Sequence, residues 1–407
     1  VTAVWNRLVK SGDIYLSKYK GWYSVSDEAY YNSDEIIEKN GKKYSTFSGS
    51  IVEWVEEESF FFKLSSWQER LLEFYDKNDK FILPISRRNE VINFVKSGLK
   101  DLSVSRTSFT WGIKVPNNHK HVIYVWLDAL TNYISALNFS STNDKLYKNF
   151  WPATLHVIGK DILRFHAIYW PAFLLAAKIK PPSRIYGHGW ILSGEEKMSK
   201  SKGNILNPLE VVKKYGVDEL RYYLMKEVPH GSDGNISLKN LENCINSDLA
   251  NNYGNLCQRV FSFVKNNCKN KVSKTKNISD ADKKLITQTK ALTNDLRNLM
   301  DSQNLNNYIK SVINISFLTN KYINDEEPWK LKKNNIEKMN NILHLALEQI
   351  AKISILLNPI IPEKSLKVLD ALNINIDSRN LAFLDEKNIL GDDIKIKKLD
   401  ILFKKIA

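Results

Sequence analysis

Apolar and polar residues follow three successive patterns along the chain. In the first hundred residues, short aromatic and β-branched runs such as GWYSVS and SFFFKL stand between polar turns. This mixture indicates a small α+β module. The stretch SSWQERLLEFYDKN within it predicts an amphipathic helix, because its apolar residues recur at helical spacing, at Trp67, Leu71, Leu72 and Tyr75.

From His121 onward, buried-strand patterns alternate with helical ones. The segments HVIYVWLDAL, TLHVIGKDI and SRIYGHGWIL each contain a short apolar run typical of a buried strand. Helical stretches such as ILRFHAIYWPAFLLAAKI separate them. Strands and helices that alternate in this way predict an α/β fold with a doubly wound parallel sheet.

After about Gly234 the apolar residues fall on a helical period. One helix is predicted over 245–263, and a second carries apolar residues from Leu343 to Leu357 and ends before Pro359. The last third of the chain is therefore expected to be an α-helical bundle. The turn-like cluster HGSDGNIS places its boundary near residues 230–240.

The composition allows a large core and suggests an anionic partner. The chain has 407 residues, and 59 Lys and Arg against 45 Asp and Glu give a formal net charge of +14. This excess is typical of a protein that binds polyanions. The sequence is also rich in Asn, Lys and Ile, so a general drift in composition explains the excess equally well.

Cysteine usage and hydropathy indicate the compartment. The three cysteines show no CxxC spacing and are expected to be free thiols in a reducing environment. No apolar run approaches the roughly 18 residues of a membrane-spanning helix. We therefore expect a cytoplasmic protein without a membrane segment. The chain begins with Val1 inside a predicted helix, so a preceding segment is expected to be missing.

The segment GEEKMSKSKGN, residues 194–204, concentrates chemistry in one short loop. Its ammonium groups, hydroxyls and glycine suit a phosphate chain whose negative charge grows during a reaction. A solvated basic loop would have the same composition. The pattern alone leaves both interpretations open.

The string KMSKS resembles the second signature of class I aminoacyl-tRNA synthetases. The surrounding segments resemble the methionyl-tRNA synthetase family in particular: GWYSVSDEAYY, FFFKLS, DLSVSR, YVWLDALTNYISAL, HVIGKDILRFH, YWPAFL, DELRYYL, NNYGNLCQR and NDEEPW. These matches extend from residue 21 to residue 329. The resemblance implies an ATP-dependent ligase that activates methionine and transfers it to the 3′ end of tRNA(Met). ATP with Mg²⁺, methionine and tRNA are the expected ligands, and a monomer is the simpler expectation.

The resemblance also implies three domains. Residues 1–115 hold the end of the first catalytic half and an inserted connective module. Residues 116–235 hold the second half of the Rossmann-like catalytic sheet with the KMSKS loop, and residues 236–407 form an α-helical anticodon-binding domain. The His-Ile-Gly-His signature of the family does not occur in the 407 residues, so the chain by itself is expected to be inactive.

Residue roles follow from matching positions. The resemblance makes Lys200 the residue that stabilises the triphosphate during adenylation, with Lys197, Ser199 and Ser201 shaping the loop. Gly159, Asp161 and Met198 are implied to contact ATP or the adenylate, and an N-cap role for Asp161 at the helix that follows is compatible with its position. The implied methionine pocket consists of Trp126, Ala129, Leu130, Tyr133, Ile162 and His166. The implied anticodon readers are Asn255, Arg259 and Trp329.

One departure concerns zinc. Some family members carry cysteines where this chain reads GWYSVSDE, and here Ser24 and Asp27 occupy those positions. Since that pair cannot build a thiolate site, no structural zinc is expected, and the module should be held together by its own aromatic residues. Two other functions remain open: a class I synthetase for another apolar amino acid, and a non-catalytic RNA-binding protein derived from a synthetase.

Overall fold

The computed structural model describes residues 1–24, 29–31, 35–46, 48–194, 196–198, 206–275, 277–385 and 390–406. The chain forms two compact units, residues 1–188 and residues 189–407. Each unit has its own hydrophobic core. Within the described residues, no helix combines the length and the apolar character needed to cross a membrane.

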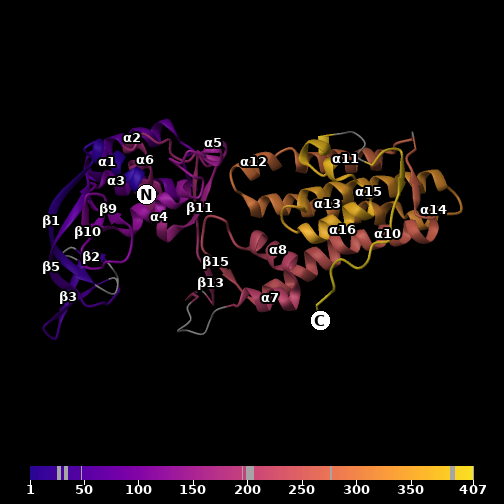
Figure 1. Ribbon diagram of the computed structural model, residues 1–407. Helices are drawn as coiled ribbons and strands as arrows, with labels where there is room; N and C mark the ends of the chain where they lie inside the picture. The colour runs from indigo at the N-terminus through magenta and orange to yellow at the C-terminus, as the bar shows by residue number, and fades with distance from the viewer. Residues whose placement is uncertain are drawn as a thin grey trace. The chain divides into compact units, whose positions relative to one another are not determined.

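An antiparallel sheet forms the outer part of the first unit (Figure 1). The order of its strands is β2 (Ala29–Tyr31), β1 (Ile14–Ser24), β5 (Glu53–Phe62) and β7 (Leu102–Ser103). The small hairpin of β3 (Ile36–Lys39) and β4 (Lys42–Ser45) adjoins it in sequence. Trp22 lies opposite Trp54 on neighbouring strands, with ring centroids 5.3 Å apart in an edge-to-face arrangement. This pair contributes to the aromatic packing that was expected in the module.

Helices cover the core of the same unit. They are α1 (Thr2–Lys10), the 3-10 turn η2 (Leu64–Trp67), α2 (Gln68–Lys77) and α3 (Ile85–Lys96). Helix α2 confirms the amphipathic prediction, since Leu71 and Tyr75 are buried on one face. The hydroxyl of Tyr75 donates a hydrogen bond to the carbonyl oxygen of Ala167 at 2.6 Å. The first hundred residues thus form the predicted α+β module.

A parallel sheet of three strands lies next to this module in the first unit. Strand β12 (Ile185–His188) is central, and β11 (His156–Gly159) and β6 (Ile82–Leu83) pair with it in parallel. The connection from β11 to β12 contains η3 (Lys160–Ile162), a π-helical segment η4 (Phe165–Tyr169) and α6 (Trp170–Ala176). The parallel strand–helix–strand arrangement predicted for TLHVIGKDI and SRIYGHG is confirmed.

The pairing expected for HVIYVWLDAL is wrong. Its strand β10 (Asn118–Ile123) pairs antiparallel with β8 (Ser105–Arg106) and β9 (Lys114–Val115) in a separate sheet. Only two residues separate β9 from β10, and Asn117 adopts a left-handed conformation with φ 64°. Such a connection makes a hairpin and is too short for a parallel crossover. The strand still leads into a helix, α4 (Val125–Ser135), which α5 (Lys145–Phe150) follows.

The pattern SRIYGHGWIL produces two strands, one in each unit. After β12, strand β13 (Ile191–Ser193) begins the second unit, where it pairs in parallel with β15 (Gly234–Ile236) and antiparallel with β14 (Glu196–Lys197). At Gly189 a Cβ atom would lie 2.1 Å from the backbone of Ser232. Only glycine fits this approach of two backbone segments.

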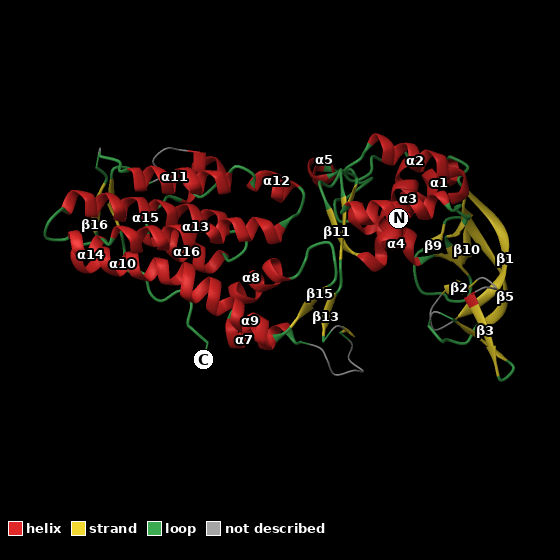
Figure 2. Ribbon diagram, turned by 180° about the vertical axis from the view of Figure 1, so that it is seen from behind, coloured by secondary structure: helices red, strands yellow, loops and turns green. Residues whose placement is uncertain are grey.

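Helices form most of the second unit and lie alongside one another (Figures 1 and 2). They are α7 (Pro208–Tyr215), α8 (Val217–Glu227), α9 (Leu238–Cys244), the π-helical η6 (Ile245–Gly254), α10 (Asn255–Asn267), α11 (Asp280–Thr293), α12 (Leu296–Asp301), α13 (Leu305–Glu326), α14 (Pro328–Leu331), α15 (Ile336–Leu357), α16 (Pro362–Ala371) and the 3-10 turns η7 (Ile376–Ser378) and η8 (Leu381–Asp385).

The two helical predictions for this region are confirmed. The run η6–α10 covers 245–263, and α15 ends at Leu357, two residues before Pro359. The apolar positions predicted for α15, from Leu343 to Leu357, are at most 1% exposed. A short antiparallel pair that the pattern did not predict, β16 (Lys271–Ser273) and β17 (Asp393–Lys395), closes the bundle at one side.

Candidate functional site

Helix α4 and the π-helical segment η4 bring two polar aromatic side chains together in the first unit. The Tyr133 hydroxyl lies 2.8 Å from Nε2 of His166, and Nδ1 of His166 lies 3.0 Å from the carbonyl oxygen of Ile162. The π-helical turn places His166 on the side of η4 where it meets α4. Three of the residues implied in the methionine pocket therefore form one hydrogen-bonded chain.

The protons of this chain can be assigned. A carbonyl oxygen only accepts, so Nδ1 of His166 carries a proton and donates it to Ile162. Burial lowers the pKa of His166 below its usual value, which favours the neutral ring at neutral pH. Nε2 is then an acceptor, and the Tyr133 hydroxyl donates to it. Neither side chain keeps a proton to offer a ligand in this conformation.

Two aromatic neighbours that the sequence did not single out complete the cluster. His156 stacks on Tyr133 with ring centroids 4.1 Å apart, and Phe165 stacks on Trp126 with centroids 3.5 Å apart. Burial lowers the pKa of His156 to about 4, and its Nδ1 has no hydrogen-bond partner within the part of the chain that the structure describes. The density of rings in RFHAIYW is a sequence signal that could have indicated Phe165, whereas LHVIG offers only the ring of His156 and gives no such signal.

The other residues expected in this pocket differ in exposure. Leu130 is only 1% exposed and belongs to the hydrophobic core. Ala129 is exposed, while Trp126 and Ile162 are half-buried and pack against the same core. The half-buried aromatic faces and Ala129 can meet a ligand, whereas Leu130 supports them from behind.

The carboxyl end of β11 carries the residues expected near ATP. Gly159 ends the strand opposite His188 of β12, and Asp161 follows inside the turn η3. A Cβ atom at Gly159 would lie only 2.5 Å from Oδ1 of Asp161, so the glycine leaves room for this carboxylate. Asp161 is exposed, and its carboxylate makes no hydrogen bond among the described residues. Ligands of parallel α/β sheets bind at such strand ends.

The basic loop begins on a hairpin. Strands β13 and β14 pair through Leu192 and Lys197, with Gly194 in a left-handed turn at φ 64°. Met198 follows, half-buried against the core of the second unit. Ser199, Lys200 and Ser201 lie outside the described residues.

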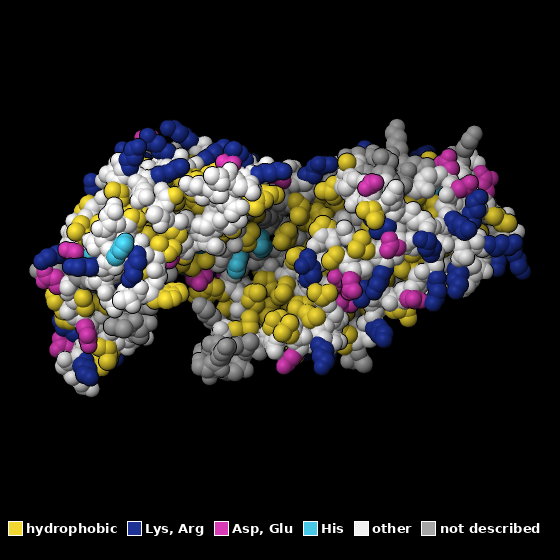
Figure 3. Space-filling model, viewed as in Figure 1, with side chains coloured by type: hydrophobic (Ala, Val, Ile, Leu, Met, Phe, Trp, Pro, Cys, Tyr) yellow, Lys and Arg dark blue, Asp and Glu magenta, His cyan; other side chains and the backbone are white. Residues whose placement is uncertain are grey.

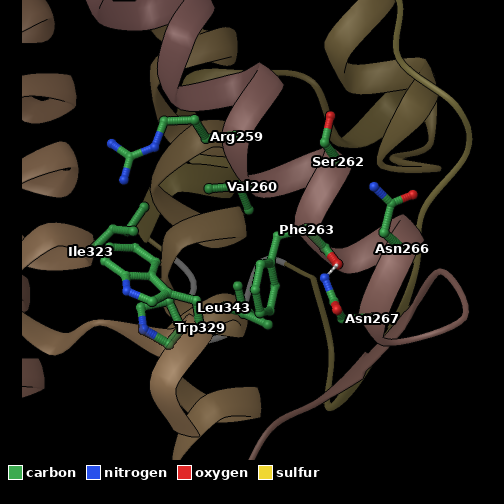
Figure 4. Close-up of a pocket in the computed structure, with 10 residues that line it drawn as sticks. Arg259, Val260, Ser262, Phe263, Asn266, Asn267, Ile323, Trp329 and Leu343 are labelled. Atoms are coloured by element: carbon green, nitrogen blue, oxygen red, sulfur yellow. Dashed lines mark hydrogen bonds between the residues drawn. The ribbon is translucent and has the colours of Figure 1, made fainter. Parts of the chain in front are cut away.

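The second unit brings Arg259 and Trp329 together around a cavity of about 300 Å³ (Figure 4). The Arg259 guanidinium donates a hydrogen bond to Oδ1 of Asn324 at 2.8 Å and lies 5.9 Å from the centre of the Trp329 ring. Glu327 has a left-handed backbone with φ 44° between α13 and α14, which turns the chain so that Trp329 reaches the cavity. The Trp329 side chain is 43% exposed.

Helix α10 supplies most of the remaining wall. Phe263 and Asn266 follow Arg259 by four and seven residues, so they lie on the same helical face and line the cavity with it. This spacing is a signal that could have identified both residues from the sequence. Asn255 begins α10 one turn before Arg259; it is exposed and does not line the cavity.

Both parts of the chain match known families. Residues 1–261 match the family described as tRNA synthetases class I (M), and residues 272–407 match the anticodon binding domain of methionyl tRNA ligase. The methionine–tRNA ligase of Rickettsia typhi is 48% identical over 409 aligned residues, which cover 100% of this chain and 80% of that protein. The Brucella suis enzyme is 47% identical over 93% of this chain and 74% of its own length.

The chain belongs to the methionyl-tRNA synthetases.

Structures of this family agree with the fold. A crystal structure of Mycobacterium tuberculosis methionyl-tRNA synthetase bound by methionyl-adenylate superposes with a TM-score of 0.92 at 40% identity, covering 99% of this chain and 80% of that chain. The apo form of the same enzyme also gives 0.92, at 38% identity. The predicted fold class and family are confirmed, and the protein is a methionine–tRNA ligase. The alternative of a synthetase for another apolar amino acid is set aside.

Membership of the methionyl-tRNA synthetase family does not by itself establish whether this chain binds structural zinc. Ser24 lies buried in β1, and Asp27 lies outside the described residues. Among the residues that the structure describes, no three or more His, Cys, Asp or Glu side chains are grouped so that they could hold a metal ion. The absence of structural zinc stays a prediction.

Proposed function

We propose that the aromatic cluster of the first unit binds the methionine side chain. The observation that carries this proposal is the chain from Tyr133 through His166 to the Ile162 carbonyl, because it uses the protons of Tyr133 and His166 within the protein. A thioether is polarizable and a weak acceptor, and it gains most from aromatic faces and edges. Trp126, Ala129, Tyr133, Ile162 and His166 would enclose it, and Leu130 would support them.

The adenylation step would use the strand end and the basic loop. A carboxylate oxygen of methionine attacks the α-phosphorus of ATP, the bond to the β-phosphate oxygen breaks, and pyrophosphate leaves. Asp161 is free to accept hydrogen bonds from the ribose hydroxyls, and Gly159 gives it room. Met198 adjoins the adenylate in this proposal. Lys200, aided by Lys197, Ser199 and Ser201, would stabilise the charge that develops on the phosphates. Mg²⁺ would accompany ATP as a counterion of these phosphates.

The second unit would read the tRNA. An amide, a guanidinium and an indole suit the unstacked bases of a loop, since two offer hydrogen bonds and the third a stacking surface. Arg259 and Trp329 meet at one cavity and would hold a base of the CAU anticodon, with Asn255 one turn away. The 3′-terminal hydroxyl of the tRNA then attacks the methionyl carbonyl, and AMP leaves.

Three coarser expectations belong to the same proposal. The division into 1–115, 116–235 and 236–407 describes functional parts. The boundary between the two compact units falls elsewhere in the sequence, between residues 188 and 189. A monomer remains the simpler state. Cys244, Cys257 and Cys268 are free thiols, which fits a reducing compartment such as the cytoplasm.

The decisive experiment is methionine-dependent ATP–pyrophosphate exchange by the protein expressed from its full reading frame. Lys200→Ala should lower kcat by about a hundredfold or more, as removal of a preorganised transition-state donor does. Lys213→Ala, an exposed lysine on α7, is the matched control and should leave the rate unchanged. An unchanged rate for Lys200→Ala would refute the assignment. No exchange by the wild-type protein would contradict the proposed adenylation step.

A further inference from the structure

A second groove lies on the face of helix α10 next to the Arg259–Trp329 cavity. Its volume is about 160 Å³, and α10 and the chain segment 397–401 form its walls. Ser262 lines both hollows, and its hydroxyl accepts a hydrogen bond from the Gln258 side chain at 3.1 Å. The two hollows therefore lie on adjacent faces of α10 and share Ser262 at their common edge.

The groove is built on fixed elements. The backbone N–H of Lys397 donates to the carbonyl oxygen of Ala371 at 2.7 Å. Leu402 and Phe403, directly after the groove segment, are 7% and 5% exposed. Phe261 lines the floor and is 3% exposed. The wall at 397–401 is thus held against the bundle at both ends.

Its rim is positively charged. Lys265, Lys397 and Lys398 line the groove together with a single carboxylate, Asp400. Asp400 forms an ion pair with Lys398 at 2.8 Å. Lys265 and Lys397 are exposed and have no ion pair within 4 Å in the part of the chain that the structure describes. The hydrogen bond from Lys398 lowers the pKa of Asp400, and the charge of Lys265 also helps to lower it, so the three lysines and one carboxylate leave the groove with a net charge of +2.

The charge continues onto the strands that flank the groove. Lys271 of β16 and Lys395 of β17 lie directly opposite each other, a like-charge pair that costs stability. Asp393 offsets only Lys271, with their charged atoms 3.5 Å apart. On the face shown in Figure 3, Lys and Arg side chains gather toward the end of the helical unit that holds α14.

From this arrangement we infer that the groove of Lys265 and Lys397 binds phosphates of the RNA strand whose base enters the Arg259–Trp329 cavity. The inference rests on the proposed anticodon-reading function. A helix with its side chains is about 10–12 Å across, so a strand that crosses α10 at Ser262 meets both hollows within a few nucleotides. The cavity reads a base, and the groove holds the backbone without reading sequence.

Salt dependence of tRNA binding to the full chain tests this division. Fluorescence anisotropy would compare two tRNAs, one with the CAU anticodon and one with an altered anticodon. Each phosphate contact on a single strand contributes about 0.7 to the slope of log K against log salt, so Lys265→Ala with Lys397→Ala should reduce the slope by about 1.4. If the variant and the wild type bind tRNA equally at about 1 M salt, a slope difference of about 1.4 makes the variant bind roughly 25-fold more weakly at about 0.1 M salt. Both tRNAs should lose the same factor.

Three further proteins make the outcome decisive. The double variant Lys265→Arg with Lys397→Arg should keep the wild-type slope, because it keeps both charges. Lys290→Ala with Lys310→Ala removes two exposed lysines from α11 and α13 and should change the slope little. Trp329→Ala should alter discrimination between the tRNAs and leave the slope nearly unchanged. Thermal unfolding of each variant would verify that it is folded.

An unchanged slope for the Lys265, Lys397 double alanine variant would overturn the inference, and that result is also expected if the groove serves an acidic protein segment. An equal loss in the arginine variant or in the control pair would overturn it as well. If Trp329→Ala leaves discrimination intact while the alanine pair lowers the slope, the anticodon proposal fails and the phosphate groove stands.

Discussion

The aromatic cluster of the first unit and the Arg259–Trp329 cavity of the second unit differ in how their polar groups are paired and in how far their rings are exposed. In the cluster, the Tyr133 hydroxyl and the His166 ring use their protons on each other and on the Ile162 carbonyl. In the cavity, the Trp329 ring is 43% exposed, and Arg259 makes a single hydrogen bond to Asn324. The Tyr133 and His166 protons are thus used within the protein, whereas the cavity leaves a half-exposed ring face beside the Arg259 guanidinium.

This difference matches the ligands proposed for the two sites. A thioether side chain is only a weak hydrogen-bond acceptor, so a site whose Tyr133 and His166 protons are already paired can enclose it without breaking those bonds. A loop base brings polar edges and a π-face, and it must enter and leave while attached to its strand. A half-exposed indole beside a guanidinium suits such an exchange.

The largest expected effect tests whether the cluster depends on the core behind it. Leu130→Ala should lower the free energy of unfolding by about 3 kcal/mol, since the side chain is 1% exposed and its removal leaves a cavity. Ala129→Ser, one position earlier on the exposed side of α4, should change it by less than about 1 kcal/mol. Urea-induced unfolding would measure both. Equal losses would contradict the assignment of Leu130 to the supporting layer.

Acid should weaken the first unit through His156. Burial lowers the pKa of this ring to about 4, so between that value and its ordinary pKa the unfolded chain binds more protons than the folded one. Stability should therefore fall as the pH decreases below about 6.5, by roughly 2 kcal/mol between pH 7 and pH 5. His166, whose pKa is also lowered, acts in the same direction.

Urea-induced unfolding at both pH values would measure the effect of His156. His156→Phe keeps a ring against Tyr133 and removes the titration, so its stability should depend less on pH by that amount. The same pH dependence in wild type and variant would show that His156 does not titrate as described.

A substitution in the Arg259–Trp329 cavity should change the preference of the protein for the CAU anticodon. Trp329→Ala removes the stacking face, and a stacked base contributes about 1–3 kcal/mol, so the preference for the CAU anticodon should fall by roughly 30-fold. The ratio of tRNA binding constants for CAU and altered anticodons would measure it. Phe317→Ala is a suitable control, because Phe317 is an aromatic residue of α13 that is 50% exposed and does not line the cavity. A preference that survives Trp329→Ala would exclude the ring as a reader.

Local periodicity predicted the helices well. The steps of three and four residues in α15 and in the η6–α10 run depend only on neighbours along the chain, and the structure confirms both. Strand partners are set by distant segments. The apolar run of β10 therefore indicated a strand but not its antiparallel pairing, which the short turn at Asn117 decides.

In the two sites as well, contacts between distant segments could not be predicted from local sequence patterns. The pairing of Arg259 with Trp329 joins residues of two helices and followed only from the family resemblance, whereas Phe263 and Asn266 could have been found from helical spacing. The stacking of His156 on Tyr133 depends on how β11 meets α4, which no local pattern encodes. The proton assignment of His166 required the distance to the Ile162 carbonyl.

The smallest expected effect separates charge from shape in the open cavity. Arg259→Lys keeps the positive charge but loses the planar fork that donates to Asn324 and faces the Trp329 ring. The preference for the CAU anticodon should fall by about fivefold, close to 1 kcal/mol, because a cation–π contact and one hydrogen bond at a half-exposed site contribute about that much. The salt dependence of tRNA binding should stay as in the wild type, since the charge is retained. Arg297→Lys, an exposed arginine on α12, is the matched control. If Arg259→Lys lowered the salt slope and left the anticodon preference intact, Arg259 would be a phosphate contact, and the cavity would belong with the lysine groove on the adjacent face of α10.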